Sequence, residues 1–153
     1  MESYDSGPNQ PPTLEETIGA NFERTVAAYP DVEALVDVAQ GRRWTYAELN
    51  DEIDVVARGL MALGIQKGDR VGMWAPNCAE WTITQYATAK IGAILVNINP
   101  AYRTHELAYV LNQSGTRMLM SASSFKTSNY RSMIEEVRPQ CVALREVLFV
   151  DTD

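Results

Sequence analysis

The residues best placed to bind a ligand lie in two short polar segments, each of which follows a predicted strand. One segment is Asn-Ile-Asn-Pro-Ala-Tyr-Arg at positions 97–103, and the other is Ser-Ser-Phe-Lys at positions 123–126. Ligands of open parallel sheets bind beyond the carboxyl ends of the strands, and both segments precede predicted helix N-termini. Arg103 and Lys126 would add positive charge to the free backbone N–H groups of those helices. The segments could therefore hold a phosphate-bearing ligand, or they could be ordinary surface loops.

The glycines do not form a nucleotide-binding motif. Neither the dinucleotide fingerprint nor the Walker phosphate loop occurs in the sequence. Gly64, Gly68 and Gly72 lie between a predicted helix and the next strand, whereas a phosphate cradle must open a helix N-terminus. These positions favour a tight turn.

The single histidine and the two cysteines do not predict a catalytic or metal-binding group. His105 and Glu106 are neighbours on a predicted helix, where successive side chains point roughly 100° apart, so they could not share a metal ion. We expect a solvated His105 and a Glu106 that interacts with the helix N-terminus. Cys78 falls in a predicted first helical turn, whose dipole could lower the thiol pKa, but no histidine or lysine close in sequence completes a nucleophile. The sequence thus offers no catalytic residue and no metal site.

The tryptophans and the clustered carboxylates are better explained by the fold than by chemistry. Trp44, Trp74 and Trp81 have apolar neighbours in predicted strands and helices, which favours core packing. Asp51, Glu52 and Asp54 belong to the polar side of a predicted helix. We expect these carboxylates to be solvated.

Composition bounds the kind of protein that could carry these segments. The chain has 153 residues, of which 46% are hydrophobic, and this size suits one ordinary domain. A formal net charge of -7 repels phosphate backbones and argues against nucleic-acid binding. The few cysteines fit a reducing compartment, and neither a secretory signal nor an apolar run of membrane-spanning length occurs. We therefore expect a cytoplasmic protein.

The first third of the chain predicts a lead-in, a helix and a hairpin. Residues 1–12 are polar and proline-rich, which favours a flexible segment ahead of an α/β domain at residues 13–153. A stripe of apolar residues at every fourth position then predicts a helix that stops before Pro30: Leu14, Ile18, Phe22 and Val26. Residues 34–38 and 42–46 flank a Gln-Gly turn and favour a β-hairpin.

The second helix has the clearest boundaries in the sequence. Thr45 and Glu48 form a capping box, in which each side chain can bond an otherwise unpaired backbone N–H. At the other end, Gly64 suits a left-handed C′ position, and Ile65 could contact Leu60 in a Schellman motif.

The rest of the chain predicts a series of βαβ units. Strands are expected to start near Arg70, Ala93, Arg117 and Glu146, with room for one crossover helix between each pair. The expected helices run from Asn77, capped by Glu80, to Gly92, from Thr104 to Gly115, and from about Ser124 to Val137, where Pro139 ends the last. This is an α/β fold, layered α/β/α, with a mostly parallel sheet. A sheet that ends on the strand 147–150 leaves an edge uncovered, so we expect further polypeptide to pack there.

Several segments, in this order and spacing, resemble the start of the adenylate-forming enzymes, specifically AMP-forming acyl-CoA synthetases of the fatty-acid–CoA ligase type. The similarity covers about residues 14–151. It rests on Thr-Tyr-Ala-Glu-Leu at 45–49, Gly-Ile-Gln-Lys-Gly-Asp-Arg-Val at 64–71, Ala-Pro-Asn at 75–77, Gly-Ala at 92–93, Asn-Ile-Asn-Pro-Ala-Tyr at 97–102, Glu-Leu at 106–107 and Ser-Gly at 114–115.

The resemblance implies a two-step reaction in a larger enzyme. A carboxylate attacks ATP, assisted by Mg²⁺, to give an acyl-adenylate and pyrophosphate, and the CoA thiol then displaces AMP. The chain would supply only the N-terminal subdomain. The family's Ser/Thr/Gly-rich phosphate loop, its adenylate-contacting carboxylates and its C-terminal lysine have no match here, so we expect the chain alone to be inactive and to bind ATP, Mg²⁺ and CoA at most weakly.

The same resemblance gives the polar strand ends a role. In similar enzymes this edge lies on the side where CoA enters, which implies that five residues lie near bound CoA: Asn99, Pro100, Ala101, Tyr102 and Lys126. The expected partners are the remainder of the chain and a fatty acid or other carboxylate, and a homodimer is compatible with the sequence. The alternative is a self-contained doubly wound binding or interaction module without catalysis.

Overall fold

The chain folds around a parallel sheet with helices on both faces. The computed structural model describes residues 7, 8 and 10–150, so most of the predicted lead-in at 1–12 lies outside the described residues. The four-stranded sheet has the order β4-β3-β5-β8, and its strands are Ile94–Asn97, Arg70–Trp74, Met118–Ala122 and Glu146–Val150. Every neighbouring pair is parallel. The predicted layered α/β/α fold is confirmed.

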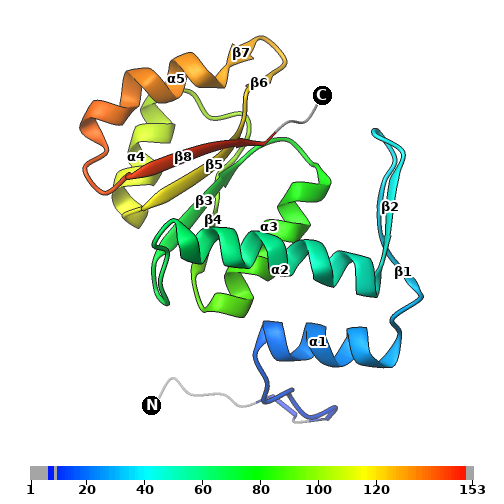
Figure 1. The fold of residues 1–153 in the computed structure, drawn as a ribbon. Helices are drawn as coiled ribbons and strands as arrows, with labels where there is room; N and C mark the ends of the chain where they lie inside the picture. The colour runs from blue at the N-terminus through cyan, green and yellow to red at the C-terminus, as the bar shows by residue number, and fades with distance from the viewer. Residues whose placement is uncertain (1–6, 9, 151–153) are drawn as a thin grey trace, which may run out of the picture.

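The side chains of the central strands show which helices cover which face. Successive strand residues point to opposite faces. The sulfur of Met120 accepts a hydrogen bond from Thr84 of α3 (Ala79–Ile91), whereas the ring of Trp74 stacks on Tyr130 of α5 (Tyr130–Val137). Met73 pairs with Met120, so Trp74 faces the other side. Figure 1 shows the result: α4 (Thr104–Ser114) and α5 lie on one side of the sheet, and α1 (Ile18–Ala28), α2 (Tyr46–Ala62) and α3 lie on the other.

The first helix is shorter than its apolar stripe predicts. Thr17 is the N-cap of α1 and accepts a hydrogen bond from the amide of Ala20 at 3.1 Å. Leu14 therefore precedes the helix and is exposed, and Ile18 is exposed as well. Phe22 is buried, with its ring centroid 4.4 Å from that of Tyr86 in α3. The prediction that Leu14 belongs to the buried stripe was wrong, because the local cap outweighs the four-residue periodicity.

The hairpin and the second helix are confirmed. Strands β1 (Glu33–Asp37) and β2 (Arg42–Thr45) pair antiparallel. Thr45 and Glu48 form both bonds of the capping box of α2. At its end the amide of Ile65 donates to the carbonyl of Leu60 and that of Gly64 to Met61, which is the Schellman pattern.

Two of the predicted helix starts were wrong. Helix α3 begins after Cys78 rather than at Asn77, and Glu80 makes no capping box because its carboxylate pairs with the Arg42 guanidinium at 2.8 Å. Helix α5 begins at Tyr130 rather than near Ser124, and the residues between form a small hairpin of β6 (Ser124–Phe125) and β7 (Ser128–Asn129). The strand starts and the glycine ends of α3 and α4 agree with the sequence within a residue, and the 3₁₀ turn Arg138–Gln140 containing Pro139 follows α5.

Strand β8 forms one edge of the sheet among the described residues. Its Leu148 is 37% exposed, and it lies on the same face as Met120, with which it pairs. No helix in the described part of the chain is long and apolar enough to cross a lipid bilayer.

Candidate functional site

The turn after β4 presents the first predicted segment at the carboxyl end of the sheet. The Asn99 side-chain oxygen accepts a hydrogen bond from the amide of Ala101 at 2.9 Å, and its backbone carbonyl accepts one from Tyr102 at 3.0 Å. Asn99 and Ala101 are exposed, and Pro100 and Tyr102 are half-buried. The sequence Asn-Pro-Ala-Tyr therefore forms a compact turn that displays its polar side chain and one small residue to solvent.

The second predicted segment forms the β6–β7 hairpin, with Lys126 at its tip. Lys126 has a φ of 53°, in the left-handed region that residues other than glycine, asparagine and aspartate rarely adopt. The hairpin and the start of α5 enclose an open hollow of about 370 Å³. Its lining is rich in hydroxyl groups and carries two cations: Ser123, Ser124, Lys126, Thr127, Ser128, Asn129 and Arg131.

Two contacts join the two segments, although β4 and β5 are not neighbours in the sheet. The Arg103 guanidinium donates to the Ser128 hydroxyl at 2.6 Å. The Tyr130 hydroxyl donates to the Pro100 carbonyl oxygen. The polar strand ends thus form one continuous surface, which we call the strand-end surface and define as residues 99–103 and 123–131.

Sequence reasoning missed the part of this surface that begins α5. Arg131 donates to the Ser123 hydroxyl at 3.0 Å, and its guanidinium carbon lies 3.8 Å from the centroid of the Phe149 ring. This places a third cation beside Arg103 and Lys126. The signal that could have found the boundary is Asn129, whose side chain caps α5 by accepting from the amide of Ser132 at 3.1 Å.

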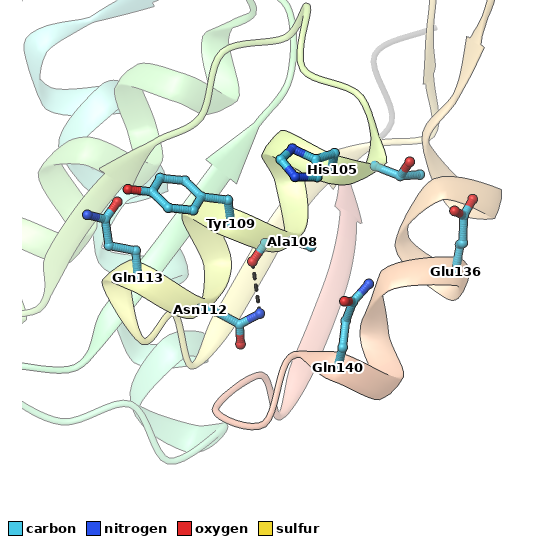
Figure 2. Close-up of a pocket in the computed structure, with 8 residues that line it drawn as sticks. His105, Ala108, Tyr109, Asn112, Gln113, Glu136 and Gln140 are labelled. Carbon is cyan, nitrogen blue, oxygen red and sulfur yellow. Dashed lines mark hydrogen bonds between the residues drawn. The ribbon is translucent and has the colours of Figure 1, made fainter.

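Another hollow lies elsewhere, between α4 and α5. It has a volume of about 750 Å³ and contains none of the five residues predicted to lie near CoA. Figure 2 shows His105, Tyr109 and Gln113 along α4, facing Glu136 of α5 and Gln140 beyond it, while the Asn112 amide bonds back to the carbonyl of Ala108. These are mainly polar side chains on the outside of two helices, away from the turn at residue 99.

The residues for which the sequence predicted no catalytic role are either exposed, bound to backbone groups or packed in the core. His105 is exposed, and the Glu106 carboxylate accepts from the Arg103 amide at 3.1 Å. Hydrogen bonds from backbone N–H groups lower the pKa of Glu106. Burial raises the pKa of the Cys78 thiol to about 11, opposite to the effect that a helix dipole would have. Trp74 is fully buried, and Trp44 and Trp81 pack half-buried against the core, as predicted.

No metal centre is assembled from the residues that the structure describes. Nowhere among them do three His, Cys, Asp or Glu side chains gather in a way that could hold a metal ion. The Asp37 and Glu80 carboxylates instead bind the Arg42 guanidinium, at 2.9 and 2.8 Å, and tie the β1–β2 hairpin to α3.

An α/β unit with polar and cationic loops at the carboxyl ends of its parallel strands belongs to a class of folds that bind ligands at that edge of the sheet. A family model described as AMP-binding enzyme matches residues 22–153. The chain belongs to this family.

The most informative relatives are acyl-CoA ligases and synthetases. The chain is 42% identical over 138 residues to the mitochondrial medium-chain acyl-CoA ligase ACSF2 of Macaca fascicularis and 41% identical over the same length to that of Homo sapiens, in each case over 90% of this chain and 22% of the relative. Its fold matches the crystal structure of the N-terminal domain of FACL13 from Mycobacterium tuberculosis with a TM-score of 0.80 and 28% identity, over 90% of this chain and 34% of that one. The chain therefore spans about a fifth of the length of the curated relatives that it matches.

Proposed function

We propose that this chain is the N-terminal part of a ligase that uses ATP to join a medium-chain fatty acid or another carboxylate to CoA. The observation that carries the proposal is the 42% identity, over 138 residues, to a medium-chain acyl-CoA ligase. In the whole enzyme, the carboxylate would attack ATP to give an acyl-adenylate and pyrophosphate. The CoA thiol would then displace AMP. Mg²⁺ would neutralise phosphate charge in the first step.

The described residues support a scaffold role within this enzyme. The strand-end surface is cationic and contains no aspartate, glutamate or histidine, so it holds no acid and base pair suited to acyl transfer. The Glu106 carboxylate accepts hydrogen bonds from backbone amides, and the Cys78 thiol is protonated at neutral pH because its pKa is about 11. We therefore expect the reacting groups to come from polypeptide that packs against this unit, with β8 as one edge available to it.

Asn99, Pro100, Ala101, Tyr102 and Lys126 form, in this proposal, part of the wall along which CoA enters. CoA carries phosphate groups, and Lys126 is an exposed cation at the tip of a hairpin beside Arg103 and Arg131. An ammonium group close to a phosphate strengthens binding by a charge-assisted hydrogen bond. If ATP binds to residues outside this chain, it does not contact Lys126.

Replacing Lys126 tests the assignment in the full-length enzyme. Lys126→Ala is expected to raise the KM for CoA about 3- to 10-fold, the range for loss of one partly solvated charged contact, and to leave the KM for ATP unchanged. Lys67→Ala is the matched control, because Lys67 is exposed and precedes β3 at the opposite end of the sheet. An unchanged KM for CoA in Lys126→Ala would refute the proposal that Lys126 lies near bound CoA.

For the cellular location we propose the cytoplasm, on the low cysteine content of the chain. The relative from Macaca fascicularis is named as mitochondrial, which makes the mitochondrion the competing location. Fractionation of the source cells, with detection of the full-length protein, distinguishes the two.

A further inference from the structure

Two buried aromatic rings lie directly against the turn of residues 99–102. Trp74 is the last residue of β3, and Tyr130 is the first residue of α5. Both side chains are fully buried, and their rings are stacked with centroids 3.6 Å apart and planes inclined by 7°. Close packing in the interior leaves such buried rings little freedom to reorient.

Each ring donates a hydrogen bond to the same turn. The Trp74 indole N–H donates to the backbone carbonyl of Asn99 at 3.0 Å, and the Tyr130 hydroxyl donates to the carbonyl of the next residue, Pro100. Burial raises the pKa of Tyr130 to about 12, so its hydroxyl carries the proton it donates at neutral pH. Two successive carbonyl groups are thus held by donors from two other elements.

This arrangement determines which groups of the turn reach solvent. The carbonyl groups of Asn99 and Pro100 are bound by buried donors, and Asn99 and Ala101 are the exposed residues of the turn, while Pro100 and Tyr102 are half-buried. Ordinary core packing would require only apolar contact between the rings. The pair of directed donors has a further effect, which is to fix the height and tilt of the turn relative to the sheet.

We infer that Trp74 and Tyr130 form a turn clamp, and that these two residues are positioning residues for the wall along which CoA enters. The inference rests on the proposed function for the identity of the ligand. It assigns the clamp an effect on CoA alone, since the residues that it holds are Asn99 and Pro100.

The decisive variant is Tyr130→Phe in the full-length enzyme, which keeps the stacked ring and removes only the hydroxyl. We expect faster amide hydrogen exchange in the peptide that contains residues 98–103 and a roughly 2- to 10-fold higher KM for CoA, the range for one lost hydrogen bond. The KM for ATP and the turnover number at saturating CoA should stay unchanged. Tyr29→Phe is the matched control, because Tyr29 is exposed at the end of α1.

A second variant, Trp74→Phe, removes the other donor and keeps an aromatic ring in the stack. It should increase hydrogen exchange in the same peptide and raise the KM for CoA. In the double variant Trp74→Phe/Tyr130→Phe, removing the Tyr130 hydroxyl should raise the exchange rate and the KM for CoA by a smaller factor than it does in the wild-type enzyme. If Trp74→Phe does not fold, Tyr130→Phe still decides the question.

The outcomes separate this inference from the proposed function. Unchanged exchange at residues 98–103 in Tyr130→Phe would overturn the clamp. Faster exchange with an unchanged KM for CoA would overturn the positioning role. A wild-type full-length enzyme that forms no acyl-CoA would overturn the proposed function and with it the CoA assignment, while hydrogen exchange would still establish or refute the clamp itself.

Discussion

The ammonium group of Lys90 lies 2.7 Å from the Asp54 carboxylate, and this pair joins α3 to α2. The same ammonium is 2.7 Å from the Asn50 side-chain oxygen and 3.2 Å from the Glu23 carboxylate of α1. The side chain of Lys90 is only 9% exposed, so one nearly buried cation connects three helices. Asp51, Glu52 and Asp54 were predicted to be solvated, and Asp54 is only partly so, because its carboxylate also binds Lys90.

Removing the charge of Lys90 should destabilise the helical layer. Lys90→Met keeps the length of the side chain and deletes the cation, which leaves Asp54 and Glu23 without their partner. We expect the free energy of unfolding to fall by about 1–3 kcal/mol, less than for a fully buried pair because Asp54 is partly solvated. Urea unfolding of Lys90→Met and of the exposed control Lys67→Met measures the difference. Equal stability of the two variants would show that the three contacts contribute nothing.

The cap of α2 should be worth a measurable amount. Thr45→Ala removes the hydroxyl that accepts from the Glu48 amide at 3.3 Å and bonds the Glu48 carboxylate at 2.9 Å. A loss of about 1 kcal/mol in unfolding free energy is expected for an N-cap. Thr13→Ala, at an exposed position ahead of α1, serves as the control and should stay within about 0.5 kcal/mol of wild type. A smaller effect at Thr45 than at Thr13 would refute the assignment of the cap.

Two glycines with the same backbone conformation should differ in their tolerance of alanine. Gly115 and Gly41 have φ values of 62° and 67°. A Cβ at Gly115 would lie 2.6 Å from an Arg70 guanidinium nitrogen, whereas one at Gly41 would meet nothing within 4 Å. That guanidinium is held by the carbonyls of Ser114 and Gly68, so it cannot move without losing hydrogen bonds.

Both alanine variants should therefore lose about 1 kcal/mol to the left-handed backbone, and Gly115→Ala should lose roughly a further 1–2 kcal/mol. Chemical unfolding of both variants side by side gives the comparison. Equal losses would mean that Arg70 relaxes freely and that the contact has no energetic weight.

The thiol of Cys78 should be unreactive near neutral pH. Burial raises its pKa from 9.0 to about 11, and the thiolate is the nucleophilic form. At pH 8 the thiolate fraction is then about 100-fold smaller than for a thiol of ordinary pKa. Alkylation by iodoacetamide, followed by peptide mapping to separate Cys78 from Cys141, should be slow at pH 8 and accelerate toward pH 11. If Cys78 is alkylated at pH 8 as fast as free cysteine, its thiol is not buried with a raised pKa.

The sequence predicted most accurately the elements whose boundaries are set locally. Helix α2 has its start in Thr45 and Glu48 and its end in Gly64 and Ile65, and all four residues act as expected. The two central parallel strands, β3 and β5, were predicted equally well because buried strands are continuous apolar runs.

Two of the wrong helix starts lie next to contacts with residues that are distant in the sequence. Glu80 does not cap α3, because Arg42 of the hairpin takes its carboxylate, and this partner is 38 positions away in sequence. The start of α5 was misplaced because the β6–β7 hairpin, which Arg103 contacts through Ser128, occupies the residues ahead of the Asn129 cap. The two polar segments of the strand-end surface were predicted, but Trp74 was expected only to pack in the core, and its hydrogen bond to the Asn99 carbonyl could not be predicted from the sequence.

The measurement that tests the account most directly is carboxylate-dependent release of pyrophosphate from ATP, made on the full-length enzyme and on the 153-residue chain alone. We expect the full-length enzyme to release pyrophosphate with a medium-chain fatty acid and to form acyl-CoA when CoA is added, and the chain alone to release none. Pyrophosphate release by the isolated chain, or a full-length enzyme whose ATP turnover ignores the carboxylate, would contradict the assignment of this unit as the scaffold of an acyl-CoA ligase.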